Sequence, residues 1–191
     1  MLNKQRVVCQ EETLGKLSEA TLLLDATAFI DAFKSPIFAD FLTELNDDGC
    51  TFATIPSVLY EFKRGAKDII QVNNYNQFIK EMKIATISQI ESMAQKPDNQ
   101  LFTTIYNCMA SNGRKEKGPS YTDSLLCLAL YIYKHANIHL LTTNYKDIPL
   151  SLFDRENIIA FDTGRDIRTA AIYKLSEEKL ARKLQSFSEV N

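Results

Sequence analysis

Short apolar segments alternate with longer segments of helical spacing along this chain, and that alternation most restricts what it can fold into. The apolar segments predicted to be strands are "TLLL" (21–24), "CTFATIP" (50–56), "KIATIS" (83–88), "NIHLLTTN" (137–144) and "IIAFDT" (158–163). Strands separated by helix-length connections pair in parallel. The sequence therefore predicts an α/β fold with three layers, α/β/α, around a central parallel sheet. The stretch that follows the last strand is expected to be a helix.

Length and the lack of a linker indicate one domain. The chain has 191 residues, and no glycine- or serine-rich stretch or internal repeat divides it. We expect a single domain over residues 21–191, preceded by a polar N-terminal extension over residues 1–20. The four cysteines are scattered without a CxxC pair, which is typical of reduced thiols. A signal peptide or a membrane span of ~20 apolar residues is not evident, so a cytoplasmic protein is expected.

Four carboxylates lie just past predicted strands or at the start of predicted helices: Asp25, Glu61, Asp123 and Asp147. In sheets of this kind, ligands bind beyond the carboxyl ends of the parallel strands, so these side chains are expected at one edge. Carboxylates that are crowded together repel one another, and a bound Mg²⁺ or Mn²⁺ would compensate that repulsion. Such an ion can activate water against a phosphodiester. The pattern therefore predicts metal-assisted hydrolysis.

The order of these motifs resembles that of the PIN-domain ribonucleases, many of which are toxins of bacterial type II toxin–antitoxin modules. "LLLDATAFIDAF" resembles the first motif of the family, with a hydroxyl residue, Thr27, close behind the acid. "IPSVLYEFKRG" and "YTDSLLCLALYI" are similar to the second and third motifs, and "LLTTNYKDI" to the fourth. The resemblance covers roughly residues 20 to 160.

The resemblance implies a PIN-like fold and a metal-dependent RNA endonuclease that hydrolyses phosphodiester bonds, of which a toxin is one form. It implies that Mg²⁺ or Mn²⁺ is bound by Asp25, Glu61, Asp123 and Asp147. Asn144 stands where many members have an acid, and its carbonyl oxygen is also a candidate ligand. The fourth ligand therefore stays open between Asn144 and Asp147. The partners implied are an RNA substrate, an antitoxin protein and a second copy of the chain.

Two compact basic clusters lie next to candidate site acids, "KRGAK" at 63–67 and "GRKEKG" at 113–118. Basic side chains bind nucleic-acid phosphates without reading sequence, although clusters of this size are also common on solvated surfaces. The net charge of −2 argues against binding driven by bulk charge. The residues expected to contact RNA are Thr27, Lys63, Arg64, Lys67, Arg114 and Lys115.

Each acid also has a purely structural explanation. Asp25 suits a helix N-cap, Glu61 suits an ion pair with Arg64, and Asp123 suits the first turn of a helix. Asp147, like Asn144, suits a turn. Asp31 lies six residues beyond Asp25 and is expected to point away from the site. The inference therefore rests on the joint pattern of the acids.

A second function from a different class remains open. A PIN-like domain that has lost its chemistry would serve as a binding or scaffolding module. Ala26, which stands where the family often has a hydroxyl residue, and Asn144 support this alternative.

Overall fold

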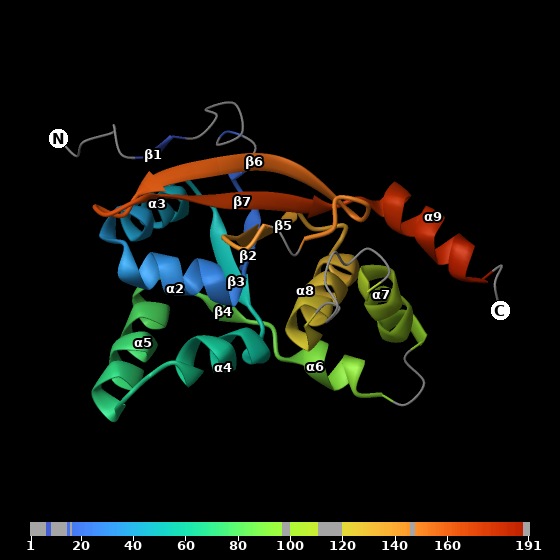
Figure 1. The fold of residues 1–191 in the computed structure, drawn as a ribbon, viewed down its shortest axis with the longest axis horizontal. Coiled ribbons are helices and arrows are strands. Elements are labelled where there is room, and N and C mark those ends of the chain that lie inside the picture. Colours follow the sequence, from blue (N-terminus) through green and yellow to red (C-terminus); the bar gives the residue numbers. More distant parts are fainter. Residues whose placement is uncertain are drawn as a thin grey trace.

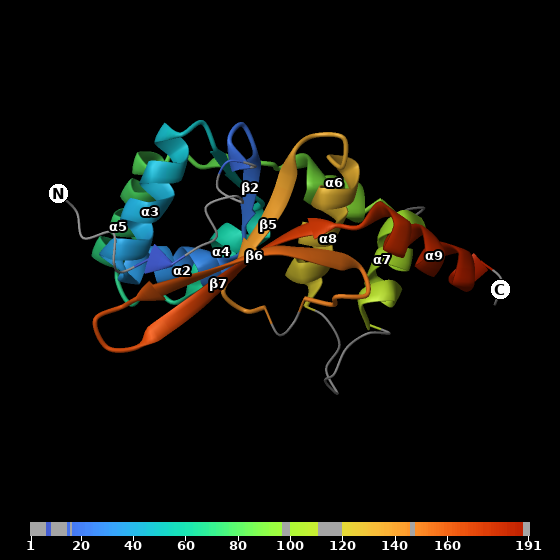
Figure 2. The same cartoon turned by 90° about the horizontal axis from the view of Figure 1, so that it is seen from above.

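A mixed β-sheet lies at the centre of the computed structural model. The structure describes residues 7–8, 15, 17–96, 100–110, 120–145 and 148–188. These residues form a seven-stranded sheet with the strand order β1-β6-β7-β5-β2-β3-β4. Helices cover both faces of the sheet (Figures 1 and 2). The predicted three-layer α/β arrangement is therefore confirmed, whereas its assignment to a particular family stays a prediction.

Four neighbouring strands form the parallel half of the sheet. In sheet order they are β5 (Ile138–Thr142), β2 (Thr21–Leu24), β3 (Thr51–Thr54) and β4 (Ala85–Thr86). β2 lies between β5 and β3, with Leu22 opposite His139 on one side and Phe52 on the other. Leu22 and Leu23 are fully buried, as the continuous apolar run predicts for a strand covered on both faces. The carboxyl ends of these strands therefore meet at one edge.

The other half of the sheet is antiparallel, which the sequence did not indicate. It consists of β1 (Val7–Val8), β6 (Phe153–Asp162) and β7 (Ile167–Leu175), and β7 pairs antiparallel with β5. The helix expected over the last stretch is therefore wrong across residues 167–175. Alanine and lysine in this segment favour a helix, but β7 gains a hydrogen-bonded neighbour on each side, and Ala170 to Tyr173 are buried between them.

The helices fall into two groups on opposite faces of the sheet (Figure 2). One group contains α2 (Ala26–Lys34), α3 (Pro36–Asp47) and α5 (Ile69–Glu81), and the other contains α6 (Gln89–Ala94), α7 (Gln100–Ala110) and α8 (Tyr121–Ile132). The C-terminal helix α9 (Glu177–Ser188) contacts α7, and it is the part of the final stretch where the predicted helix is confirmed. Among the described residues, no helix is both long and apolar enough to cross a bilayer.

The short helix α4 (Pro56–Arg64) follows β3 and is fixed by an aromatic cluster. Pro56 opens the helix at a position where proline loses no useful N–H. Phe62 is buried, and its ring lies 4.3 Å from that of Tyr75 on α5 and 5.2 Å from that of Phe29 on α2. Burying one such side chain contributes about 1.5–3 kcal/mol. This packing sets the rotation of α4 and turns the preceding residue, Glu61, away from the aromatic cluster.

Three described cysteines, Cys50, Cys108 and Cys127, are buried and free, in agreement with the expected reduced thiols. Burial raises the pKa of Cys127 to about 12, so this thiol is protonated and inert at neutral pH. The fourth cysteine, and most of the expected N-terminal extension, lie outside the described residues.

Candidate metal centre

Asp25 lies at the junction of β2 and α2, at the carboxyl edge of the parallel strands. Its Oδ1 accepts a hydrogen bond of 2.8 Å from the backbone N–H of Thr27, which makes Asp25 the N-cap of α2. Its own N–H donates to the carbonyl oxygen of Leu141 on β5, at 3.1 Å. The structural role considered for Asp25 is therefore real. It also places the carboxylate where a ligand would bind in a fold of this type.

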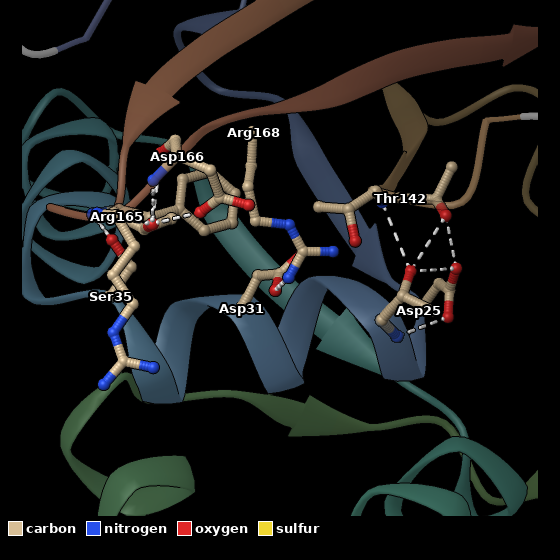
Figure 3. Close-up of polar contacts among 11 residues, drawn as sticks. Asp25, Asp31, Ser35, Thr142, Arg165, Asp166 and Arg168 are labelled. Carbon is tan, nitrogen blue, oxygen red and sulfur yellow. Dashed lines mark hydrogen bonds and ion pairs between the residues drawn. The ribbon is translucent and has the colours of Figure 1, made fainter.

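Two threonine hydroxyls hold the second oxygen of Asp25 (Figure 3). Thr27 Oγ1 donates to Asp25 Oδ2 at 2.9 Å, and Thr142 Oγ1, at the end of β5, donates to the same oxygen. Each hydroxyl in turn accepts from a backbone N–H, that of Thr143 for Thr27, at 3.2 Å, and that of Asn144 for Thr142, at 3.0 Å. The orientation of the carboxylate is thus fixed by a network that joins β2, α2 and β5.

Glu61 and the start of α8 lie beside this network. Glu61 Oε1 accepts a hydrogen bond of 2.5 Å from the hydroxyl of Thr122, which joins α4 to the first turn of α8. The neighbouring Asp123 closes a capping box, since its Oδ2 accepts from the N–H of Ser120 at 3.1 Å and its own N–H donates to the Ser120 hydroxyl at 3.0 Å. The helix-start role considered for Asp123 is therefore confirmed.

The pKa of Asp25 is raised above its ordinary value of 3.8, chiefly because burial penalises the charged form. Hydrogen bonds from Thr142 and Thr27 lower the pKa and offset part of this effect, whereas the negative charge of Glu61 raises it further. The charge of Glu61, on α4, thus adds to the penalty on the charged form of Asp25, at the start of α2. A cation between them would relieve this repulsion, and perturbed carboxylates of this kind are frequent at functional sites.

The structure brings together part of the predicted site. The charge of Glu61 acts on Asp25, and Asp123 lies next to Thr122, the hydrogen-bond partner of Glu61. Within the described ranges, no group of three or more His, Cys, Asp and Glu residues could hold a metal ion. Asp147 lies outside these ranges, as do Arg114 and Lys115. The described part of the centre is therefore a pair of carboxylates.

A carboxylate pair fits the requirements of Mg²⁺. This ion keeps several waters and is commonly bound through one or two carboxylates together with substrate phosphates. The oxygen donors around Asp25 and Glu61 match the preference of hard divalent cations, and nitrogen or sulfur ligands are not needed. Asp25 and Glu61 could therefore hold Mg²⁺ or Mn²⁺.

The first basic cluster lies on the same helix as Glu61. Lys63 and Arg64 occupy the last turn of α4, where basic side chains also suit the helix dipole, and Lys67 follows shortly after. Arg64 and Lys67 are exposed, and Lys63 is partly exposed. Lys63 and Arg64 lie within one turn of Glu61 on α4, and Lys67 lies three residues beyond the end of this helix.

Thr142 is the functional candidate that sequence reasoning missed. It is fully buried, and its hydroxyl reaches a carboxylate 117 residues away along the chain. The available signal was its place near the end of a predicted strand, at the edge of the sheet where Asp25 was also expected. Comparison with family models, curated protein sequences and solved structures gives no match to this chain. Arguments about function therefore rest on the residues and geometry described above.

Proposed function

We propose that this protein is a metal-dependent endonuclease with a PIN-like fold that hydrolyses phosphodiester bonds in RNA. The observation that carries the proposal is the buried carboxylate of Asp25 at the carboxyl edge of the parallel strands, whose pKa is raised mainly by burial and further by the charge of Glu61. A carboxylate in poorly solvated surroundings, with a second acid acting on it, gains from a cation. The order of the four sequence motifs adds independent support.

In this proposal, Asp25 and Glu61 hold Mg²⁺ or Mn²⁺ as direct ligands. The hydroxyls of Thr27 and Thr142 fix the Asp25 carboxylate, so that this side chain loses little conformational freedom when the ion binds. Asp123, Asn144 and Asp147 are the candidates to complete the ligand set. When bound, such an ion supplies a Lewis acid beside the phosphodiester and the charge that activates water.

RNA as the substrate is supported by the motif resemblance and by the cations that follow Glu61. Lys63, Arg64 and Lys67 would bind phosphates and position the strand without reading its sequence. A toxin of a type II toxin–antitoxin pair is one specific form of this function, and it would bring an antitoxin and a second copy of the chain as partners. An antitoxin encoded next to the gene would support that form.

A catalytically inactive binding module is the alternative, and one observation favours it. Both oxygens of Asp25 already accept hydrogen bonds from Thr27 or Thr142. A carboxylate used only as a helix cap would have the same contacts. The two functions differ in their dependence on a divalent ion.

Cleavage of labelled RNA tests the proposal. The purified protein is incubated with a mixed-sequence single-stranded RNA in Mn²⁺ or in EDTA, alongside Asp25→Asn and Asp40→Asn. Asp40 is an exposed acid on α3 and serves as the matched control. Cleavage that needs Mn²⁺, is lost in Asp25→Asn and persists in Asp40→Asn supports the endonuclease. Equal cleavage by all three proteins, or none by the unmodified protein, would refute it.

A further inference from the structure

A buried acid on α2 forms an ion pair with an arginine of the β6–β7 hairpin. Asp31 Oδ1 accepts a hydrogen bond from Nη1 of Arg168 on β7 (Figure 3). The side chain of Asp31 is 3% exposed, whereas that of Arg168 is 43% exposed. The side chain of Asp31, which was expected to point away from the site, contacts this hairpin.

The ion pair between Asp31 and Arg168 leaves hydrogen-bonding atoms of both side chains unused. Asp31 Oδ2 is buried and has no hydrogen-bond partner among the described residues. A guanidinium carries five N–H donors in a fixed plane, and the bond to Asp31 uses a single terminal nitrogen. A buried ion pair contributes little net stability, because the cost of removing two charges from water offsets their attraction. The pair is better explained as an anchor that fixes the position of a half-exposed arginine.

Arg168 binds to α2, the helix that Asp25 caps. Asp31 is four residues after Thr27, so the two side chains lie on one face of α2, about 6 Å apart. Thr27 holds Asp25 through two hydrogen bonds. Asp31, which anchors the arginine, is six residues beyond Asp25, or about 9 Å along the axis of α2.

Hydrogen bonds within the turn order the tip of the hairpin that carries Arg168. At its tip, the N–H of Gly164 donates to Asp162 Oδ1 at 2.7 Å, and the N–H of Thr163 donates to the carbonyl oxygen of Asp166 at 3.0 Å. Gly164 has a φ of +82°, a conformation that other residues rarely adopt. Figure 3 shows the side chain of Arg165, from the same tip, also reaching towards α2.

An aromatic stack fixes the base of this tip against the helices. The ring of Phe161 on β6 lies 4.3 Å from that of Phe38 on α3, with the two planes 6° apart. Both side chains are buried. The stack joins the hairpin to α3, and the ion pair of Arg168 joins it to α2.

We propose that Arg168 binds a phosphate of a single-stranded RNA that lies across the carboxylate pair, with Asp31 as the residue that positions it. A guanidinium held at one edge can offer its remaining N–H groups to a phosphate in bidentate geometry. Such a contact would fix the register of the strand next to Asp25. The choice of RNA rests on the proposed function, but binding can be measured without cleavage.

RNA binding in EDTA tests this contact separately from catalysis. The dissociation constant of a short fluorescein-labelled single-stranded RNA is measured by fluorescence anisotropy at several salt concentrations. The test variant is the double substitution Asp31→Asn with Arg168→Gln, and the control is Glu178→Gln with Arg182→Gln, which removes an exposed ion pair on α9. Both variants keep the net charge, and neither leaves a buried charge unpaired.

We expect the test variant to bind the RNA roughly tenfold more weakly. A plot of the logarithm of its binding constant against the logarithm of the salt concentration should have a slope smaller in magnitude by about 0.7, the value for one phosphate contact on a single strand. The control variant should match the unmodified protein. Equal affinity of the test variant and the unmodified protein would overturn the proposal, as would an equal loss in both variants or no binding by the unmodified protein.

A second variant covers a failure to fold. If the test variant loses its cooperative thermal transition, Arg168→Lys replaces it, because lysine keeps the charge but lacks the planar fork. Weaker binding by Arg168→Lys supports the contact, and unchanged binding overturns it. If the unmodified protein binds RNA in a way that depends on Arg168 but does not cleave it, the endonuclease is refuted and the Arg168 contact is still supported.

Discussion

Replacing Thr142 by valine should destabilise the protein in a way that depends on pH. Valine has nearly the same shape, so the change removes only the hydroxyl. That hydroxyl donates to the Asp25 carboxylate and accepts from the N–H of Asn144. A hydrogen bond to a charged group contributes about 1.5–3 kcal/mol and one between neutral groups about 0.5–1.5 kcal/mol. The expected loss in the free energy of unfolding is therefore about 2–4.5 kcal/mol at a pH where Asp25 is ionised.

The pH dependence follows from the charge on Asp25. The Thr142 hydroxyl lowers the pKa of Asp25, so its removal raises that pKa further above 3.8. The stabilisation of the carboxylate is fully present when Asp25 is ionised and is lost as the pH falls through its folded pKa. The penalty of Thr142→Val should therefore shrink in acid towards the value for the neutral bond alone.

Urea denaturation at neutral and acidic pH measures this effect, and Thr54→Val is the matched control. Thr54 is also fully buried, but its hydroxyl donates to a neutral group, the carbonyl oxygen of Leu24, at 2.9 Å. We expect Thr54→Val to cost about 0.5–1.5 kcal/mol at either pH. A penalty for Thr142→Val that is as small as that of the control, or equal at both pH values, would refute the role given to this hydroxyl.

Two further predictions concern the charge at Asp25. Because the folded pKa of Asp25 is raised, the protein should lose stability as the pH rises from 3.8 through that folded pKa, and Asp25→Asn should lack this component in urea titrations without metal. An identical dependence of stability on pH in the unmodified protein and in Asp25→Asn would contradict this prediction. Protons should compete with the ion, so the affinity for Mn²⁺ measured by calorimetry should fall on acidification. An affinity independent of pH would exclude Asp25 as a ligand.

The parts of the fold that depend on local sequence could be predicted. β2, the N-cap at Asp25 and the start of α4 at Pro56 each follow from a few adjacent residues, an apolar run, a capping side chain or a helix-compatible proline. The parallel pairing of β5, β2, β3 and β4 also agrees with the helix-length connections between them, whereas the strand predicted at 158–163 is part of the antiparallel β6. For the same reason, the position of Asp25 at the edge of the sheet was accessible from the sequence.

Features that depend on distant contacts could not be predicted. β7 consists of residues that tolerate a helix, and its two neighbouring strands decide its conformation. The role of Thr142 depends on a partner 117 residues away, and that of Arg168 on a partner 137 residues away. Neither pair has a local spacing that would reveal it.

Binding of Mn²⁺ to the free protein, followed by the loss of its electron paramagnetic resonance signal, tests the central claim most directly. The unmodified protein is titrated alongside Asp25→Asn, Glu61→Gln and the control Asp40→Asn. We predict saturable binding to the unmodified protein and to the control, and marked weakening in the two site variants, because each removes one carboxylate of the pair. Equal binding by all four proteins, or no binding by any, would contradict a metal centre at Asp25 and Glu61.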